Sequence, residues 1–127
     1  MTTEMEKIVF KKCVLEQADY LRFVGHKVRK VLSDKIGIEN VERKHPGIEF
    51  DYYMYDEVDG WIRLNTGDVY MYINKNGGET YTLSPVCEDI VYSHSYDEFV
   101  KSTINYDWSE EDWAKLREYL VNWDYFK

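Results

Sequence analysis

The sequence has few of the residues that mark secreted, metal-binding or membrane-spanning proteins. Its 127 residues include two cysteines, two prolines and three histidines. Cys13 and Cys87 do not form a C-x-x-C motif and have no histidine at ligand spacing, so we expect two buried free thiols in a reducing compartment. No apolar run of roughly 18 residues occurs, and lysines bracket the apolar stretch at residues 8–10, so neither a membrane span nor a signal peptide is expected. These absences favour a cytoplasmic protein.

Catalytic motifs are also missing. The sequence contains no glycine-rich phosphate loop and no nucleophile elbow, and His26, His45 and His94 have no second histidine three or four residues away. Asp56 and Asp59 have a D-x-x-D spacing that suits a hard cation, but the full EF-hand pattern is absent. We therefore predict no catalytic residue, no metal site and no cofactor.

What the chain does have is a high content of hydrophobic and aromatic residues. Hydrophobic residues make up 44% of it, enough for one ordinary core, and the length fits a single domain over residues 1–127. Tyrosine alone occurs 12 times. Because a tyrosine ring packs on apolar surface while its hydroxyl stays available, this excess indicates either an interaction surface or tyrosines half-buried on a sheet.

The net charge of −8 is unevenly distributed along the chain. Residues 1–45 contain ten Lys and Arg against seven Asp and Glu, whereas residues 46–127 contain six against seventeen. The first segment therefore carries a net charge of +3 and the second −11. Phosphates and anionic lipids repel such a chain, so direct binding to nucleic acid or to a membrane is not expected. A basic protein surface would attract it.

The first segment predicts a short strand and one helix. The strand is expected at residues 7–14. Over residues 16–35 the apolar residues recur at three- and four-residue spacing, which predicts an amphipathic helix. This apolar stripe comprises Leu21, Val24, Val28, Val31 and Leu32. Away from it, Arg22, His26, Arg29 and Lys30 give the helix a basic outer face.

From residue 48 the hydrophobic period changes to two, which predicts strands with one buried and one wet face. These strands are expected at residues 48–55, 61–64, 69–73 and 81–83. The turns at residues 65–68 and 74–78 contain the Asn and Gly that tight hairpins require, and such short connections favour an antiparallel meander. The face expected to receive the helices carries Ile48, Phe50, Met54, Val69, Met71, Ile73 and Leu83.

A further short strand is expected at residues 90–92, followed by two helices. Ser95 and Glu98 have the spacing of a capping box, and Ser109 precedes three acidic residues that suit a helix N-terminus. The first helix would bury Phe99, Val100 and Ile104, and the second Trp113, Leu116, Leu120 and Trp123. The predicted fold class is α+β, with an antiparallel four- to five-stranded meander packed against an N-terminal helix and two C-terminal helices.

The other face of the predicted sheet, with the acidic loop after its first strand, gathers carboxylates and tyrosines. These candidate partner-binding residues are Glu49, Asp51, Tyr53, Tyr55, Asp56, Glu57, Asp59, Tyr70 and Tyr72. Carboxylates can stand in for phosphates, and tyrosine rings for bases, on a basic nucleic-acid-binding site. We therefore expect a non-enzymatic binding protein that occupies such a site on a target protein.

In this character the chain resembles the small acidic inhibitors that phages and mobile elements use against host nucleases, including the anti-CRISPR proteins that mimic DNA. Residues 49–59 and 89–97 carry the resemblance, which is one of composition and not of a motif. The basic first helix departs from it. The resemblance implies an inhibitor, a CRISPR effector nuclease as the kind of target, and the cytoplasm of a bacterial host as its location if a phage encodes it.

Three alternatives stay open at this point. An immunity protein against a basic nuclease toxin would follow the same physical logic. A small-molecule-binding domain or small enzyme could hold a nucleotide or another anion with Arg22, Arg29, Arg63 and His94. The tyrosine face could instead join two copies of the chain in a homodimer.

Overall fold

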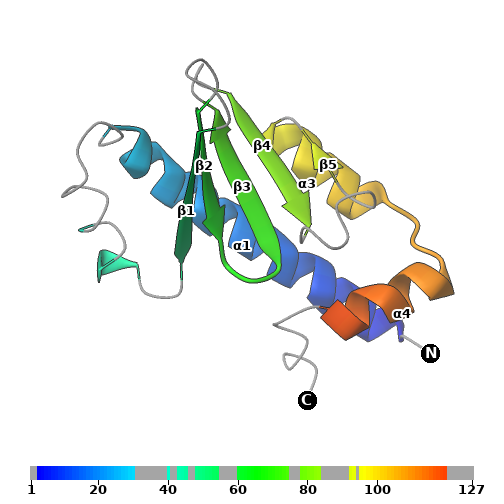
Figure 1. Cartoon of the computed structure of the whole chain (residues 1–127). Helices are drawn as coiled ribbons and strands as arrows, with labels where there is room; N and C mark the ends of the chain where they lie inside the picture. The colour runs from blue at the N-terminus through cyan, green and yellow to red at the C-terminus, as the bar shows by residue number, and fades with distance from the viewer. Residues whose placement is uncertain are drawn as a thin grey trace.

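The computed structural model describes residues 3–30, 40, 43–45, 48–54, 60–74, 78–83, 92–93 and 95–119. In chain order the elements are α1 (Glu4–Lys30), β1 (Glu49–Met54), β2 (Gly60–Asn65), β3 (Val69–Asn74), β4 (Glu79–Leu83), β5 (Tyr92–Ser93), α3 (Tyr96–Asn105) and α4 (Glu110–Tyr119). The strands form one antiparallel sheet in the order β1-β2-β3-β4-β5. Figure 1 shows α1 crossing behind this sheet, with α3 beside β4 and α4 near the N-terminal end of α1. The predicted α+β class, with an N-terminal helix and two C-terminal helices, is confirmed.

α1 runs through the region where a strand was expected. Residues 7–14 are helical, and Phe10 and Val14 are buried on the same side of the helix as Leu21. The prediction of a strand there was wrong because Phe10 and Val14 extend the three- and four-residue spacing of the apolar stripe toward the N-terminus. The result is one helix of 27 residues.

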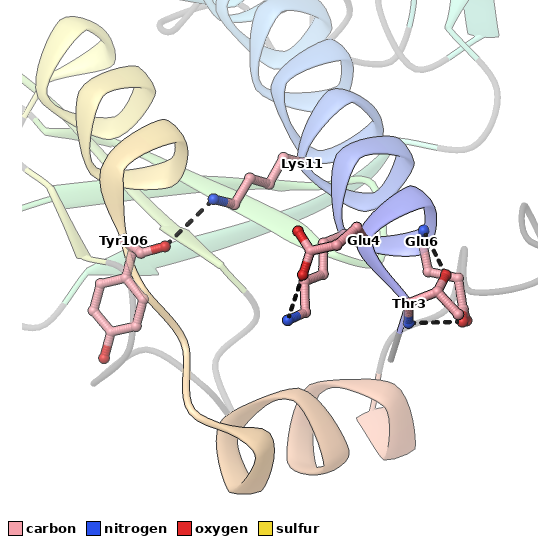
Figure 2. A network of polar contacts seen from close by, with 6 residues as sticks. Thr3, Glu4, Glu6, Lys11 and Tyr106 are labelled. Carbon is pink, nitrogen blue, oxygen red and sulfur yellow. Dashed lines mark hydrogen bonds and ion pairs between the residues drawn. The ribbon is translucent and has the colours of Figure 1, made fainter. Parts of the chain in front are cut away.

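A capping box at Thr3 and Glu6 begins α1. The backbone N–H of Glu6 donates to Thr3 Oγ1 at 3.1 Å, and the N–H of Thr3 donates to Glu6 Oε1 at 3.1 Å, as Figure 2 shows. The bond from the Thr3 N–H, together with the nearby Arg117, holds the pKa of Glu6 below its ordinary value, although partial desolvation opposes this. A T-x-x-E pattern ahead of the apolar stripe therefore marks the true start of the helix.

One face of the sheet packs against α1, and we call it the covered face. Along β3, Val69, Met71 and Ile73 are buried and alternate with Tyr70 and Tyr72, which are partly exposed. The predicted core positions Ile48, Val69, Met71, Ile73 and Leu83 are all buried. The side chains of Phe50 and Met54 lie outside the described residues. The alternation expected from the sequence thus separates the two faces correctly.

Two features bring α1 close to the sheet. Gly25 faces the side chain of Met71 so closely that a Cβ at this position would collide with the Met71 thioether methyl group. Gln17 joins the helix to the β2–β3 turn, because its amide donates to Asp68 Oδ2 at 2.8 Å and accepts from Thr66 Oγ1 at 2.6 Å. In that turn Gly67 has a φ of 108°, a left-handed conformation that favours glycine.

The two C-terminal helices begin at the predicted caps. Ser95 Oγ accepts from the Glu98 N–H at 3.2 Å, and Ser109 Oγ accepts from the Asp112 N–H at 3.1 Å. In α3, however, Thr103 is buried and Ile104 is 52% exposed, so the predicted burial of Ile104 was wrong. The reason is helical geometry: Thr103 is four residues from the buried Phe99 and lies on its side of the helix. Leu120 and Trp123 lie outside the described residues.

Aromatic rings join α4 to the N-terminal half of α1. Trp108, Trp113 and Phe10 pack edge to face, with ring centroids 4.5 to 5.3 Å apart. Lys11 Nζ donates to the carbonyl oxygens of Ile104 at 3.0 Å and Tyr106 at 3.3 Å, where α3 ends (Figure 2 shows the second bond). Its positive charge suits a helix C-terminus. Within the described ranges, no helix combines the length and hydropathy that crossing a bilayer requires.

Candidate functional site

The sheet face that points away from α1, here called the open face, brings several of the predicted site residues together. Glu49 is in register with Asn65 of β2, which in turn pairs with Tyr70 of β3. The next row joins Asp51, Arg63 and Tyr72 in the same way. Tyr53 also lies on β1, in register with Trp61 of β2. Tyr55, Asp56, Glu57 and Asp59 lie outside the described residues.

Arg63 also lies on this face, although the predicted partner-binding set did not include it. Its guanidinium carbon lies 4.8 Å from the centroid of the Tyr70 ring, a cation–π contact. It also occupies the register position between Asp51 and Tyr72. The alternation of Arg63 with Ile62 and Leu64 could have placed it here. The open face is aromatic, as expected, and Arg63 adds a cation to the carboxylates and tyrosines that the sequence predicted there.

Hydrogen bonds fix the end of the open face near the β2–β3 turn. Asn65 Nδ2 donates to Glu49 Oε2 at 3.3 Å, and Asn65 Oδ1 accepts from the Gly67 N–H. Asn65 is nearly buried while Glu49 is exposed. Asn65 thus holds the exposed Glu49 carboxylate and is itself held by the Gly67 N–H of the turn. The position of the carboxylate is therefore set before any partner binds.

The β4 part of the open face is not accessible. Thr80 and Thr82 are 2% and 0% exposed, and they pair in register with Tyr72 and Tyr70. Thr82 Oγ1 is buried without a hydrogen-bond partner. The accessible part of this face is therefore confined to β1, β2 and β3, where Glu49, Arg63, Tyr70 and Tyr72 are at least partly exposed.

Of the residues suggested for the alternative anion site, the two whose side chains the structure describes, Arg22 and Arg63, do not come together. Arg22 lies on α1, on the covered side of the sheet, whereas Arg63 lies on the open face. The Arg22 guanidinium is 4.6 Å from the centroid of the Tyr96 ring, and the Tyr96 hydroxyl donates to Asp19 Oδ1 at 3.3 Å. Arg22 thus stands beside a carboxylate. The Arg29 side chain and His94 lie outside the described residues.

Tyr96 and Tyr81 form a polar cluster with residues of α1 and β4. The Tyr81 hydroxyl donates to Glu79 Oε2 at 2.9 Å, and the other Glu79 oxygen lies 3.5 Å from His26 Nε2. Burial, reinforced by Glu79, raises the pKa of Tyr81 well above its ordinary value. Burial and Asp19 raise the pKa of Tyr96. These shifts keep both hydroxyls protonated as hydrogen-bond donors, so the cluster connects helix and sheet.

In the described ranges, no three His, Cys, Asp or Glu side chains gather closely enough to hold a metal ion. Cys13 is a buried free thiol, as predicted, and burial raises its pKa. Cys87 lies outside the described residues. A buried thiol with a raised pKa is a poor nucleophile, so Cys13 serves packing.

The described part of the chain thus offers a preordered surface on the open face of the sheet. The surface consists of Glu49, Arg63, Tyr70 and Tyr72 on neighbouring strands. Comparison with models of protein families, with curated proteins and with solved structures found no match.

Proposed function

We propose that this chain is a non-enzymatic binding protein, and that its open face occupies a basic nucleic-acid-binding site of a target protein such as a CRISPR effector nuclease. One observation carries the proposal. Partly exposed Tyr70 and Tyr72 lie on the strand next to Arg63 and Asn65, with the exposed Glu49 one strand further, on a sheet whose other face packs against α1.

The residue types on this face suit such a target. Tyrosine rings supply contact area at little entropic cost and stack on arginine side chains of a partner. The carboxylate of Glu49 is an acceptor for the lysines and arginines that otherwise bind phosphate. Arg63 contributes by contacting the Tyr70 ring, which orients that ring within the face.

The charge of the whole chain adds long-range attraction. A net charge of −8 accelerates association with a basic surface and disfavours approach to nucleic acid. Because exposed charges are screened over about 10 Å at moderate salt, binding should weaken as salt rises, mainly through a slower association rate. A single-stranded nucleic acid stacked on Tyr70 and Tyr72 is the competing ligand for this face.

The experiment compares two charge reversals of equal size. Wild type, Glu49→Lys and Glu118→Lys are immobilised and exposed to a bacterial lysate at low and at high salt. Glu118 is an exposed residue of α4 and is the matched control. We expect wild type and Glu118→Lys to retain nucleic-acid-binding proteins at low salt and to release them at high salt. Glu49→Lys should not retain these proteins at low salt.

A second measurement tests the competing ligand directly. Fluorescence anisotropy with a labelled single-stranded oligonucleotide should show no binding to wild type at moderate salt. Capture that is equal for Glu49→Lys and Glu118→Lys would overturn the proposal. Oligonucleotide binding that a Tyr70→Ser, Tyr72→Ser double variant abolishes would replace the protein target with a nucleic acid.

A further inference from the structure

A second exposed surface follows the outer side of α1, opposite its buried stripe. The residues of this surface are spaced by three or four positions. This is close to the average spacing of about 3.5 residues at which helices that pair along their length repeat their contact residues. These residues, which we call the outer stripe, are Met5, Ile8, Lys12, Glu16, Asp19, Phe23 and His26. Met5, Ile8 and Phe23 are 69%, 63% and 55% exposed, the three highest values among the large apolar side chains of the described residues.

The other sides of α1 are occupied, which leaves the outer stripe accessible. The sheet packs against the side that carries Leu21 and Val28. α4 contacts the helix through Phe10, and α3 contacts it through Lys11 and Arg22. These contact residues lie off the outer stripe. Described residues touch the stripe itself at three points: Tyr96 donates to Asp19, Glu79 lies 3.5 Å from His26, and the His45 ring lies 6.2 Å from the Phe23 ring between centroids. Met5, Ile8 and Phe23 nevertheless stay more than half exposed, so a partner can reach their side chains.

The outer stripe is complementary to itself when a second copy runs antiparallel. With a twofold axis between residues 15 and 16, Ile8 of one copy faces Phe23 of the other. In the same register Lys12 faces Asp19. Glu4 and Lys27, which border the stripe, also face each other. These three contacts pair an apolar residue with an apolar one or a cation with an anion, and symmetry repeats each of them. The same register places Met5 opposite His26 and the two Glu16 side chains beside the axis, so the complementarity resides in the three pairs. We infer that α1 is a homodimer interface formed by antiparallel pairing of the outer stripes.

The surface beside Phe23 is hollowed in a way that fits this arrangement. An open depression of about 410 Å³ is lined by Glu16, Asp19, Tyr20, Arg22, Phe23 and His26. In the inferred register the partner's Ile8 and Met5 lie opposite this stretch of α1. Lys27 Nζ lies 4.3 Å from the centroid of the Phe23 ring, so a cation already borders the depression where the partner's Glu4 would arrive.

The length of α1 limits the size of the interface. A helix of 27 residues is about 40 Å long. Pairing along one side of it uses the seven residues of the outer stripe and their neighbours, against roughly 20–30 residues a side in a standard interface. The dimer should therefore dissociate on dilution. Because the open face of the sheet lies on the other side of the molecule, this inference does not depend on the proposed function.

The first test removes the apolar contact. Sedimentation velocity over a wide concentration range is measured for wild type, Ile8→Glu, Phe23→Glu and the control Ile104→Glu. Ile104 is an isoleucine of α3 that is also more than half exposed and lies away from the outer stripe. We expect wild type and Ile104→Glu to dimerise with the same dissociation constant, and Ile8→Glu and Phe23→Glu to raise that constant about tenfold or more, the effect of losing about 1.4 kcal/mol. Circular dichroism confirms that each variant is folded.

The second test exploits the charge pairing. Lys12→Glu and Asp19→Lys each place like charges across the inferred interface, so each alone should dimerise less than wild type. Mixed together, the two variants should form a heterodimer, because the carboxylate introduced at position 12 of one copy then faces the ammonium group introduced at position 19 of the other. The unchanged Lys12 and Asp19 also face each other in this heterodimer. A wild type that stays monomeric at the highest concentration would overturn the inference. So would a dimer that Ile104→Glu or a Tyr70→Ser, Tyr72→Ser variant disrupts as strongly as Phe23→Glu.

Discussion

β3 carries both faces of the sheet, and the two differ in what they do for the molecule. Val69, Met71 and Ile73 are almost completely buried on the covered face, while Tyr70 and Tyr72 are partly exposed on the open face. The covered face is filled by side chains from α1 and α3, which come from distant parts of the sequence. The polar residues of the open face are held by neighbours on adjacent strands. The comparison indicates that the covered face supplies stability and the open face supplies a surface for recognition.

The largest expected effect on stability comes from comparing adjacent residues of β3 that lie on opposite faces of the sheet. Met71→Ala removes a fully buried side chain next to Gly25 and should lower the free energy of unfolding by about 2–5 kcal/mol. Tyr72→Ala should cost about 1 kcal/mol, the size of a cross-strand pair contribution. Urea unfolding followed by circular dichroism measures both. Equal losses for the two variants would mean that the open face is also part of the core.

A smaller effect should appear at high pH on the covered side. The raised pKa of Tyr81 means that the folded protein keeps this hydroxyl protonated, whereas the unfolded chain ionises it near pH 10. The protonated Tyr81 hydroxyl therefore makes its full contribution to the stability of the fold below about pH 10. Above that pH the free energy of unfolding falls by at most about 1.4 kcal/mol per pH unit on account of this group.

Tyr81→Phe isolates this contribution. At neutral pH the variant loses the bond to Glu79 and should be less stable by about 1 kcal/mol. Above pH 10 (the approximate ionisation point of a free tyrosine), its stability should fall less steeply than that of wild type, so the two curves converge. Urea unfolding at a series of pH values measures this. Parallel curves over the whole range would show that Tyr81 ionises equally in both states.

The smallest effect concerns Thr82, a buried threonine of the open face. Thr82→Val replaces a hydroxyl that has no hydrogen-bond partner with a methyl group of similar shape, so stability should stay the same or rise by up to about 1 kcal/mol. Thr66→Val is the matched control, because it removes the bond to Gln17 and should cost about 1 kcal/mol. Thermal unfolding measures the pair. A clear loss of stability with Thr82→Val would contradict the assignment of its hydroxyl as unpaired.

Local signals in the sequence accounted for much of the fold. The alternation around Met71 identified β3 and its two faces, and the serines at 95 and 109 marked the starts of α3 and α4. These predictions were correct because each depends on residues a few positions apart. The same kind of signal was present at Thr3 and Glu6, and using it would have placed the start of α1 correctly.

The candidate surfaces were predicted less completely. The sequence placed Glu49, Tyr70 and Tyr72 on one face, but the predicted partner-binding set left out Arg63, which lies on the strand between them. Nor did it show that Arg22 and Arg63 are on opposite sides of the sheet. Such relations depend on the pairing register and on the side from which a helix packs, which neighbouring residues do not determine.

The sequence by itself thus determined the α+β class, the alternation of the strands, the caps and the net negative charge, all of which follow from composition and short-range spacing. Only the tertiary structure decided that the open face has mixed charge and that Ile8 and Phe23 remain exposed along one side of α1. The physical reason is that hydrophobic burial is non-directional. An apolar residue is buried equally well on any side of an element that another part of the chain covers. Which side is covered depends on three-dimensional packing.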